Sequence, residues 1–196
     1  MIIMRKNIEQ ISSATSLRIA LKQGIDVAHQ LPGYETYKDS HFFTLEEFYP
    51  YLKYLITFTP LEGLHMIEEG LDDRLYKVNQ ETYSLEELIN SLTSKRYTRS
   101  RIQRMLIHIL LHNTKEEIKK ATDIDYIHIL GLSTKGQRYI KTAKKNTEYK
   151  IITNITKHKH SALDIEKRGA QLLDLVDPGF FKETIKAIPY RKIDLK

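Results

Sequence analysis

The segment from Ser94 to His112 constrains the fold most, because its apolar residues recur at the spacing of an α-helix. These residues form one stripe, made of Ile102, Met105, Leu106, Ile109 and Leu110. The segment also holds five Lys and Arg residues and no acid. The face opposite the stripe collects basic side chains, which are Arg101, Arg104, His108 and His112. We therefore expect a helix that is anchored on its apolar side and presents fixed cations on the other.

The rest of the chain has mainly helical patterns, with a change towards the end. Further helices are expected over 11–24, from Thr44, over 63–75, from Ser84, over 114–122 and over 162–175, with a turn at 31–33. Residues 126–132 and 149–155 look like strands, and 135–145 between them looks helical. This order indicates one βαβ unit with a parallel pair of strands. The expected fold class is mainly α (α+β), organised as residues 1–30, 31–122 and 123–196.

Charge is segregated along the chain. Residues 35–93 hold twelve acidic and four basic side chains, so this stretch carries about −8 while the remainder carries about +14. A basic working surface beside an acidic one favours nucleic acid as the partner of the basic part, with plain solubility as the alternative. The absence of cysteine excludes disulfides and thiolate metal sites. Short, interrupted apolar stretches predict no membrane span and a cytoplasmic protein.

Hydroxyl groups crowd the start of the first expected helix. They belong to Ser12, Ser13, Thr15 and Ser16, and Arg18 follows them closely. Free backbone amides, hydroxyl donors and a guanidinium make a good phosphate cradle. An ordinary helix cap with extra serines explains the same residues. The spacing alone leaves both interpretations open.

The run Ser13-Ala-Thr-Ser-Leu-Arg18 resembles the second signature of the HIGH-type nucleotidyltransferases, which closes over the ATP phosphates. Ala14 stands where most of that superfamily has serine, and this change is typical of its tRNA(Met) cytidine acetate ligase branch. Three further blocks resemble that branch, namely 95–98 with 101–104, Gly70-Leu71 with Arg74-Leu75, and 130–132 with Lys135-Gly136. Their order and spacing fit over most of the chain.

The resemblance implies an ATP- and acetate-dependent ligase. Such an enzyme forms acetyl-adenylate and passes the acetyl group to N4 of the wobble cytidine in elongator tRNA(Met). The first signature, with its paired histidines, normally precedes the second, but none of the ten residues before Ile11 is histidine. We therefore expect the carboxy-terminal, tRNA-binding half of the enzyme, without the Rossmann-like domain, inactive alone and with no cofactor bound. In the full-length enzyme, ATP would carry Mg²⁺ as counter-ion.

Two groups of binding residues are predicted, and the catalytic residues stay unknown. The residues predicted to bind ATP phosphate are Ser13, Thr15, Ser16 and Arg18. The residues predicted to bind RNA are Lys95, Arg96, Tyr97, Arg99, Arg101, Arg104, His108, Lys135, Arg138 and Lys141, with Tyr97 stacking on an unpaired base. No metal site is expected, because His158 and His160 alternate with lysines. The sequence does not indicate an oligomeric state.

Two other functions fit parts of this pattern. A non-enzymatic basic adaptor that binds RNA or a protein would use the hydroxyl-rich helix start only as a cap. A DNA-binding helix-turn-helix protein is the weaker alternative, because no partner helix and tight turn stand at the expected distance before residues 94–112.

Overall fold

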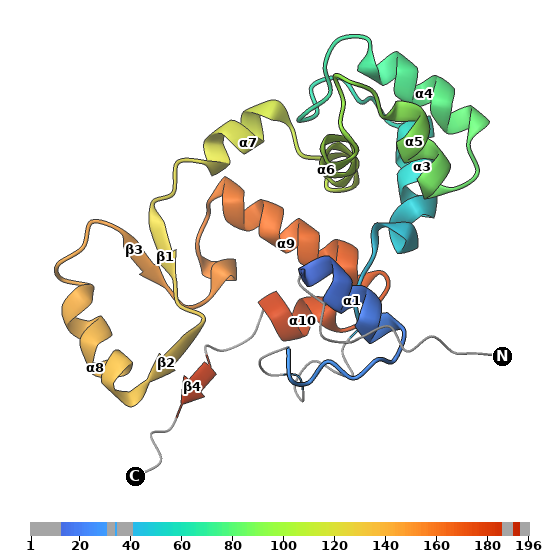
Figure 1. Ribbon diagram of the computed structural model, residues 1–196. Helices are drawn as coiled ribbons and strands as arrows, with labels where there is room; N and C mark the ends of the chain where they lie inside the picture. Colours follow the sequence, from blue (N-terminus) through green and yellow to red (C-terminus); the bar gives the residue numbers. More distant parts are fainter. Residues whose placement is uncertain (1–12, 31–33, 35–40, 186–189, 193–196) are drawn as a thin grey trace. The chain divides into compact units, whose positions relative to one another are not determined.

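The computed structural model describes residues 13–30, 34, 41–185 and 190–192 and divides the chain into two compact units, 1–44 and 45–196 (Figure 1). The predicted boundary after residue 30 lies earlier than this division. The predicted boundary after residue 122 falls inside the second unit, so the three-part organisation stays a prediction.

The described part of the first unit contains helix α1 (Ala14–Lys22). Ser13 caps it, because its Oγ accepts a hydrogen bond from the Ser16 amide at 3.1 Å. Gly24 follows with a φ of +68°, a left-handed conformation that favours glycine and ends the helix. The predicted helix and both of its end signals are confirmed. The predicted turn at 31–33 lies outside the described residues.

The second unit begins with helices and continues into short strands. The first part contains η2 (Leu45–Phe48), α3 (Tyr49–Phe58), α4 (Leu71–Glu81), α5 (Leu85–Leu92), α6 (Arg99–Leu110) and α7 (Lys115–Ala121). The second part contains β1 (Tyr126–His128), β2 (Gly131–Ser133), α8 (Thr134–Ala143), β3 (Lys150–Ile152), η3 (Ile155–Lys157), α9 (Ser161–Asp174), α10 (Phe180–Ile185) and β4 (Tyr190–Lys192). The predicted fold class, mainly helical with a small parallel sheet, is confirmed. The absence of a Rossmann-like domain stays a prediction.

Local capping explains where several helices start. The hydroxyls of Ser84 and Thr114 accept hydrogen bonds from amides three residues ahead, at 3.2 and 3.1 Å, so the predicted starts of α5 and α7 are confirmed. The prediction of a helix over 63–75 was wrong at its beginning. Gly63, Met66 and Gly70 all have positive φ, which a right-handed helix does not allow, and α4 begins only after Gly70.

The larger core lies among α3, α4, α5 and α6. From α6 it receives the stripe of Ile102, Met105, Leu106 and Ile109, each at most 1% exposed, with Leu110 packed at the edge. Each such side chain contributes about 1.5–3 kcal/mol of burial free energy. The predicted apolar stripe is confirmed.

The strands form two small parallel pairs. β1 pairs with β3, with Tyr126 opposite Lys150, and α8 lies between these strands in the chain, so the predicted βαβ unit is confirmed (Figure 1). The expected single strand over 126–132 is instead split in two. Its second piece, β2, pairs with β4, which the sequence did not predict.

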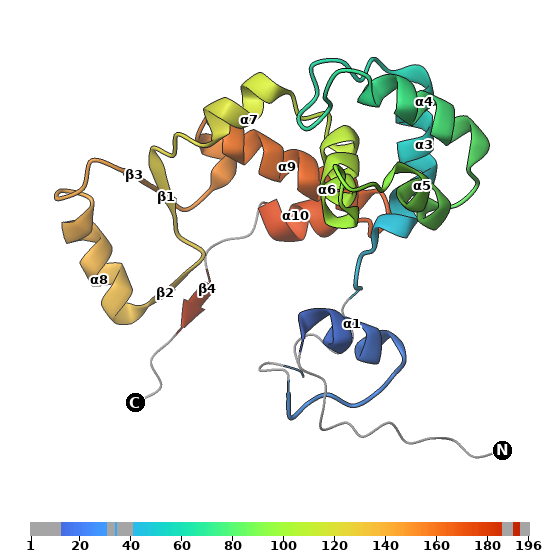
Figure 2. The ribbon, with the colours of Figure 1, turned by 45° about the horizontal axis from the view of Figure 1, so that its top comes forward.

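A second, smaller core joins the strands to the last helices. It is built from Ile152, Ile155, Leu163, Ala170 and Ile185. Arg168 of α9 donates to Oδ1 of the buried Asn113 at 2.8 Å and to Oε2 of Glu117 at 2.6 Å. Both ribbon views show α9 beside α7 (Figure 2). Arg168 therefore links α9 to the segment that connects α6 and α7.

Truncation of the α6 stripe tests the larger core. Leu106→Ala removes a side chain with no exposed surface and leaves a cavity, so we expect the free energy of unfolding to fall by about 2–5 kcal/mol. Urea denaturation measures this change. Leu130→Ala is the matched control, because Leu130 is 74% exposed. Equal losses for the two variants would contradict the assignment of this core.

The contact between His158 and Asp125 predicts a pH dependence of stability. His158 Nε2 lies 3.1 Å from Asp125 Oδ1, and this hydrogen bond holds the pKa of Asp125 below its ordinary value of 3.8. Because the pKa of Asp125 is lower in the folded chain than in the unfolded chain, the contact stabilises the fold at a pH above 3.8. This stabilisation is lost as the pH falls through the lower, folded-state pKa. We expect Asp125→Asn to lower the urea midpoint at pH 7, and the difference from wild type to vanish in acid. The exposed Asp177→Asn is the control, and a pH-independent difference for Asp125→Asn would refute this role.

Candidate nucleic-acid interface

The residues that lead into α6 form a turn and not a helix. Helix α6 begins at Arg99, after a cap residue, Thr98, with extended backbone (ψ 155°). The amide of Ser94 donates to the carbonyl of Tyr97 at 2.9 Å, and the Tyr97 amide donates back to Ser94 Oγ at 3.2 Å. Lys95, Arg96 and Tyr97 therefore belong to this turn, which corrects the expected helical start at Ser94.

Glu68 organises the turn. Its carboxylate accepts hydrogen bonds from the Tyr97 hydroxyl at 3.0 Å, from Arg96 at 2.9 Å and from Arg101. These donors, Tyr97 first, lower the pKa of Glu68. The Tyr97 ring is 8% exposed, and the guanidinium carbons of Arg96 and Arg101 lie 5.4 and 4.9 Å from its centre. In this conformation the ring belongs to the core and has no free face on which a base could stack.

Arg99 forms a third ion pair, with Glu86 of α5. Its two terminal nitrogens donate to the two carboxylate oxygens at 2.9 and 2.5 Å, and one of them also reaches Asn90 at 3.0 Å. The hydrogen bonds that Arg99 donates to Glu86 raise the pKa of Arg99. Three of the five cations in this segment are thus paired with carboxylates. No local sequence pattern predicts this pairing, because Glu68 and Glu86 lie on other parts of the chain.

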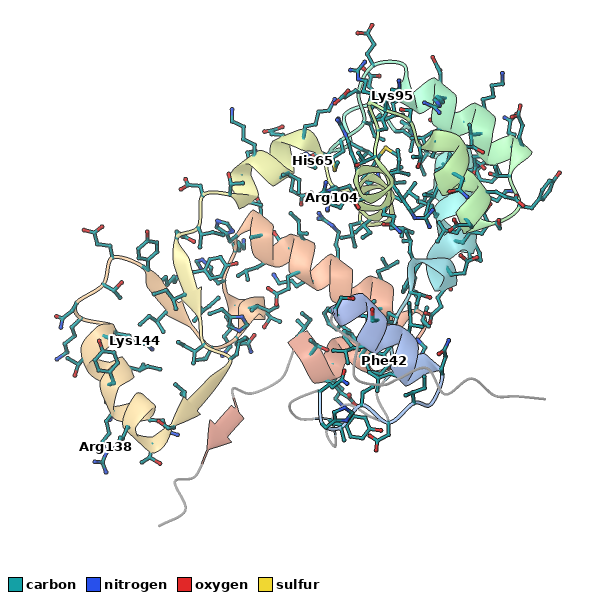
Figure 3. The ribbon with its side chains drawn as sticks, viewed as in Figure 1. Phe42, His65, Lys95, Arg104, Arg138 and Lys144 are labelled. Atoms are coloured by element: carbon teal, nitrogen blue, oxygen red, sulfur yellow. The ribbon has the colours of Figure 1, made fainter. Side chains whose placement is uncertain are left out.

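Lys95 and Arg104 remain exposed, and neither has an ion pair with any residue that the structure describes (Figure 3). His108 differs from them. Asn113 Nδ2 donates to its Nδ1 at 3.0 Å, and the ring of His65 packs edge-on with centroids 4.5 Å apart. Burial, and then His65, lowers the pKa of His108. The role predicted for His108 in RNA binding stays a prediction.

Helix α8 presents a second group of cations. Ser133 caps the helix by accepting from the Gly136 amide at 3.1 Å. The predicted residues Lys135, Arg138 and Lys141 are all exposed, and Arg138 extends away from the helix (Figure 3). Further exposed cations follow at Lys144, Lys145 and Lys150. None of these six is ion-paired within the described chain, and Glu148 is the one acid in residues 134–150.

The start of α1 has the geometry of a cap with a cation nearby. Ser13 Oγ and Ser16 Oγ lie 2.9 Å apart, and no acidic residue occupies the first turn. Arg18, the fifth residue of the helix, is exposed. The side chain of Thr15 lies outside what the structure describes. Capping explains the position of Ser13, and phosphate binding by this group stays a prediction.

The histidines near β3 make hydrogen bonds within the protein. The Ala162 amide donates to His160 Nδ1 at 3.1 Å, so Nε2 carries the proton and donates to the Asp123 carbonyl at 2.7 Å. In residues 13–30, 34, 41–185 and 190–192, no group of three or more His, Cys, Asp or Glu side chains is arranged to hold a metal ion. Within the same ranges, no helix is long and apolar enough to cross a membrane.

A hollow of about 430 Å³ lies beside the start of α4. Its walls include Glu62, Glu69, Asp72 and Asp73, with Lys115 at the edge. Glu68 also lines the hollow, so a surface that repels phosphate lies directly beside the arginines that Glu68 holds.

Comparison with curated proteins finds tRNA(Met) cytidine acetate ligases. The protein of that name from Oceanobacillus iheyensis is 32% identical over 184 residues, which cover 86% of this chain and 46% of the relative. The one from Bacillus cereus is 37% identical over 180 residues, covering 83% of this chain and 46% of the relative. The chain thus spans about half the length of the curated relatives it matches.

Two solved structures share the fold. Thermotoga maritima TmcAL without ligand superposes with a TM-score of 0.75 at 21% identity, covering 94% of this chain and 51% of that one. The form bound with alpha-thio ATP gives a TM-score of 0.76 at 21% identity and covers 94% of this chain and 53% of that one. At this identity the likeness establishes the fold alone.

A family profile settles the membership of the chain. The profile of the HIGH Nucleotidyl Transferase family matches residues 4–186, which include most of both compact units. Because the match includes the first unit, it does not support treating the chain as the carboxy-terminal half alone. The chain belongs to the HIGH nucleotidyl transferase family.

Proposed function

We propose that this chain is part of a tRNA(Met) cytidine acetate ligase and that its second unit binds the tRNA. The names of the relatives support the reaction, and the family membership supports nucleotide chemistry. In the proposed reaction, an acetate oxygen attacks the α-phosphorus of ATP and releases pyrophosphate. N4 of the wobble cytidine of elongator tRNA(Met) then attacks the acetyl carbonyl of the adenylate and releases AMP.

The observation that carries the tRNA-binding proposal is the set of cations that have no carboxylate partner. Lys95 and Arg104 flank the ion-paired arginines at α6, and α8 adds its own exposed cations. Cations on anchored backbone bind successive phosphates and release counter-ions from the nucleic acid. Arg99 is held by the exposed Glu86, and such a surface pair exchanges for phosphate at little cost, whereas Arg96 and Arg101 share the half-buried Glu68.

The start of α1 is the proposed contact with ATP phosphate. The Ser16 hydroxyl and the exposed Arg18 stand at the positive end of the helix dipole, together with Ser13 and Thr15. The alpha-thio ATP in the Thermotoga maritima structure supports a nucleotide ligand for this fold. Mg²⁺ would accompany the ATP as counter-ion. A basic RNA- or protein-binding adaptor is the second candidate, because capping alone accounts for Ser13.

Alanine substitutions on α6 and its preceding turn test tRNA binding. We expect Lys95→Ala and Arg104→Ala each to weaken tRNA binding about 3–10-fold and to lower the slope of log K against log salt by about 1. Fluorescence anisotropy over a salt series measures both quantities. Lys77→Ala is the matched control, since Lys77 is an exposed cation within the acidic stretch 35–93. If both variants bind tRNA with the affinity of the parent and with the same slope of log K against log salt, this interface is refuted.

Arg18→Ala tests the nucleotide site separately. A charge-assisted hydrogen bond to phosphate contributes about 1.5–3 kcal/mol, so we expect ATP affinity to fall about tenfold or more while adenosine affinity is unchanged. Calorimetric titration of a full-length enzyme that contains this chain, with each ligand, measures this difference. Lys77→Ala again controls for the loss of one positive charge. Equal ATP affinity for Arg18→Ala and the parent would favour the adaptor, with the helix start acting as a cap only.

A further inference from the structure

Tyr139 of α8 is exposed in a way that the fold does not explain. Its side chain is 71% exposed, and no described residue packs a ring or a cation on it. Two of the other exposed aromatic residues, Tyr54 and Tyr83, have such neighbours. Tyr54 packs against Phe58 with ring centroids 5.1 Å apart, and the Lys53 ammonium lies 5.1 Å from the ring centre of Tyr83. Tyr139 therefore presents an unused aromatic face to the surroundings.

Helical spacing places Tyr139 among cations. Lys135 lies one turn before it and Arg138 is its direct neighbour, and all three are exposed. The half-buried face of α8, which includes Gly136 and Ile140, belongs to a helix that packs on β2. Gly136 marks this contact, since a Cβ there would lie 3.7 Å from the Leu132 side chain. At about 100° per residue, Tyr139 borders this packed face, Lys135 lies beside it and Arg138 lies further round the helix, so the exposed ring has cations on its outward side.

This combination matches the chemistry of an unpaired nucleotide. A base that is not paired can stack on an aromatic ring while its flanking phosphates contact the cations beside it. In an RNA duplex the bases are stacked on one another and the major groove is too deep and narrow for side chains, so a lone tyrosine would find no free base face. A surface that bound only duplex phosphates would need the cations and not the ring.

We propose that Tyr139 is a base-stacking residue and that α8 binds a single-stranded, looped segment of RNA. This inference rests on the proposed function in one respect, namely that the second unit binds tRNA. It goes further in assigning the recognition of unpaired bases to one exposed ring on α8. Tyr97, which the sequence predicted for this role, is buried against Glu68.

The absence of tryptophan from the chain allows a direct test. Tyr139→Trp introduces a single fluorophore at the proposed contact, and stacking on a base quenches indole emission. We expect oligo-uridine and tRNA to quench this emission, and the duplex of oligo-uridine with oligo-adenine to leave it unchanged. Tyr83→Trp is the matched control, because Tyr83 is 83% exposed and lies in the acidic stretch, where no quenching is expected.

Affinity provides the second readout. We expect Tyr139→Ala to weaken oligo-uridine binding about 5–100-fold, as for other stacking residues, and Tyr139→Phe to retain it. Binding to the duplex should be the same for both variants. Because Tyr139 makes no core contact, unchanged circular dichroism and thermal midpoints will show that each variant is folded.

The outcomes separate this inference from the proposed function. If tRNA binds with parental affinity to Tyr139→Ala and leaves the tryptophan of Tyr139→Trp unquenched, the stacking role is refuted while tRNA binding stands. If poly-glutamate quenches the tryptophan as strongly as oligo-uridine does, α8 is a surface for acidic protein and the inference fails. If neither RNA binds the parent chain, the inference and the tRNA-binding proposal fail together.

Discussion

Burial of the α6 stripe is the constraint on which the basic surface depends. Ile102 and Leu106 have no exposed surface, and α3 and α5 pack against the helix that carries them. A rotation of α6 by one residue would bring Arg101 towards the core, where an unpaired charge costs several kcal/mol. Hydrophobic packing therefore fixes which α6 side chains face outward before any ligand arrives. The basic face is a consequence of the core.

Glu68 adds the second level of order. One carboxylate holds the Tyr97 hydroxyl and two guanidinium groups, and it thereby fixes the turn that leads into α6. The same carboxylate partly neutralises the local charge. Within the described residues, Lys95 and Arg104 keep no ion-pair partner, and in the sequence they lie on either side of arginines that are held in ion pairs. A phosphate that replaces the carboxylate meets side chains that have lost much of their conformational freedom.

The sequence predicted the features that depend on neighbours close in the chain. The α6 stripe, the caps at Ser13, Ser84 and Thr114, and the β1–α8–β3 order were all predicted, because each follows from spacing within one or two elements. Contacts across the chain were not predicted. The pairing of β2 with β4 spans 59 positions (Gly131 to Tyr190), and Glu68 lies 28 residues before Arg96. Tyr97 was expected to stack on a base for the same reason, since nothing near it in sequence shows that it is buried.

The two cationic surfaces differ in how firmly they are anchored. Helix α6 buries four side chains, whereas α8 buries none completely and packs mainly on the three-residue strand β2. Phosphate contacts carry little sequence information, so a ligand that must be distinguished from other RNAs requires contacts to bases. A rigid helix such as α6 suits phosphate binding, because it holds charges at fixed spacing. A lightly packed helix with an exposed ring, such as α8, suits contacts to bases, because α8 can shift slightly to meet a looped base without disturbing the core that orients α6.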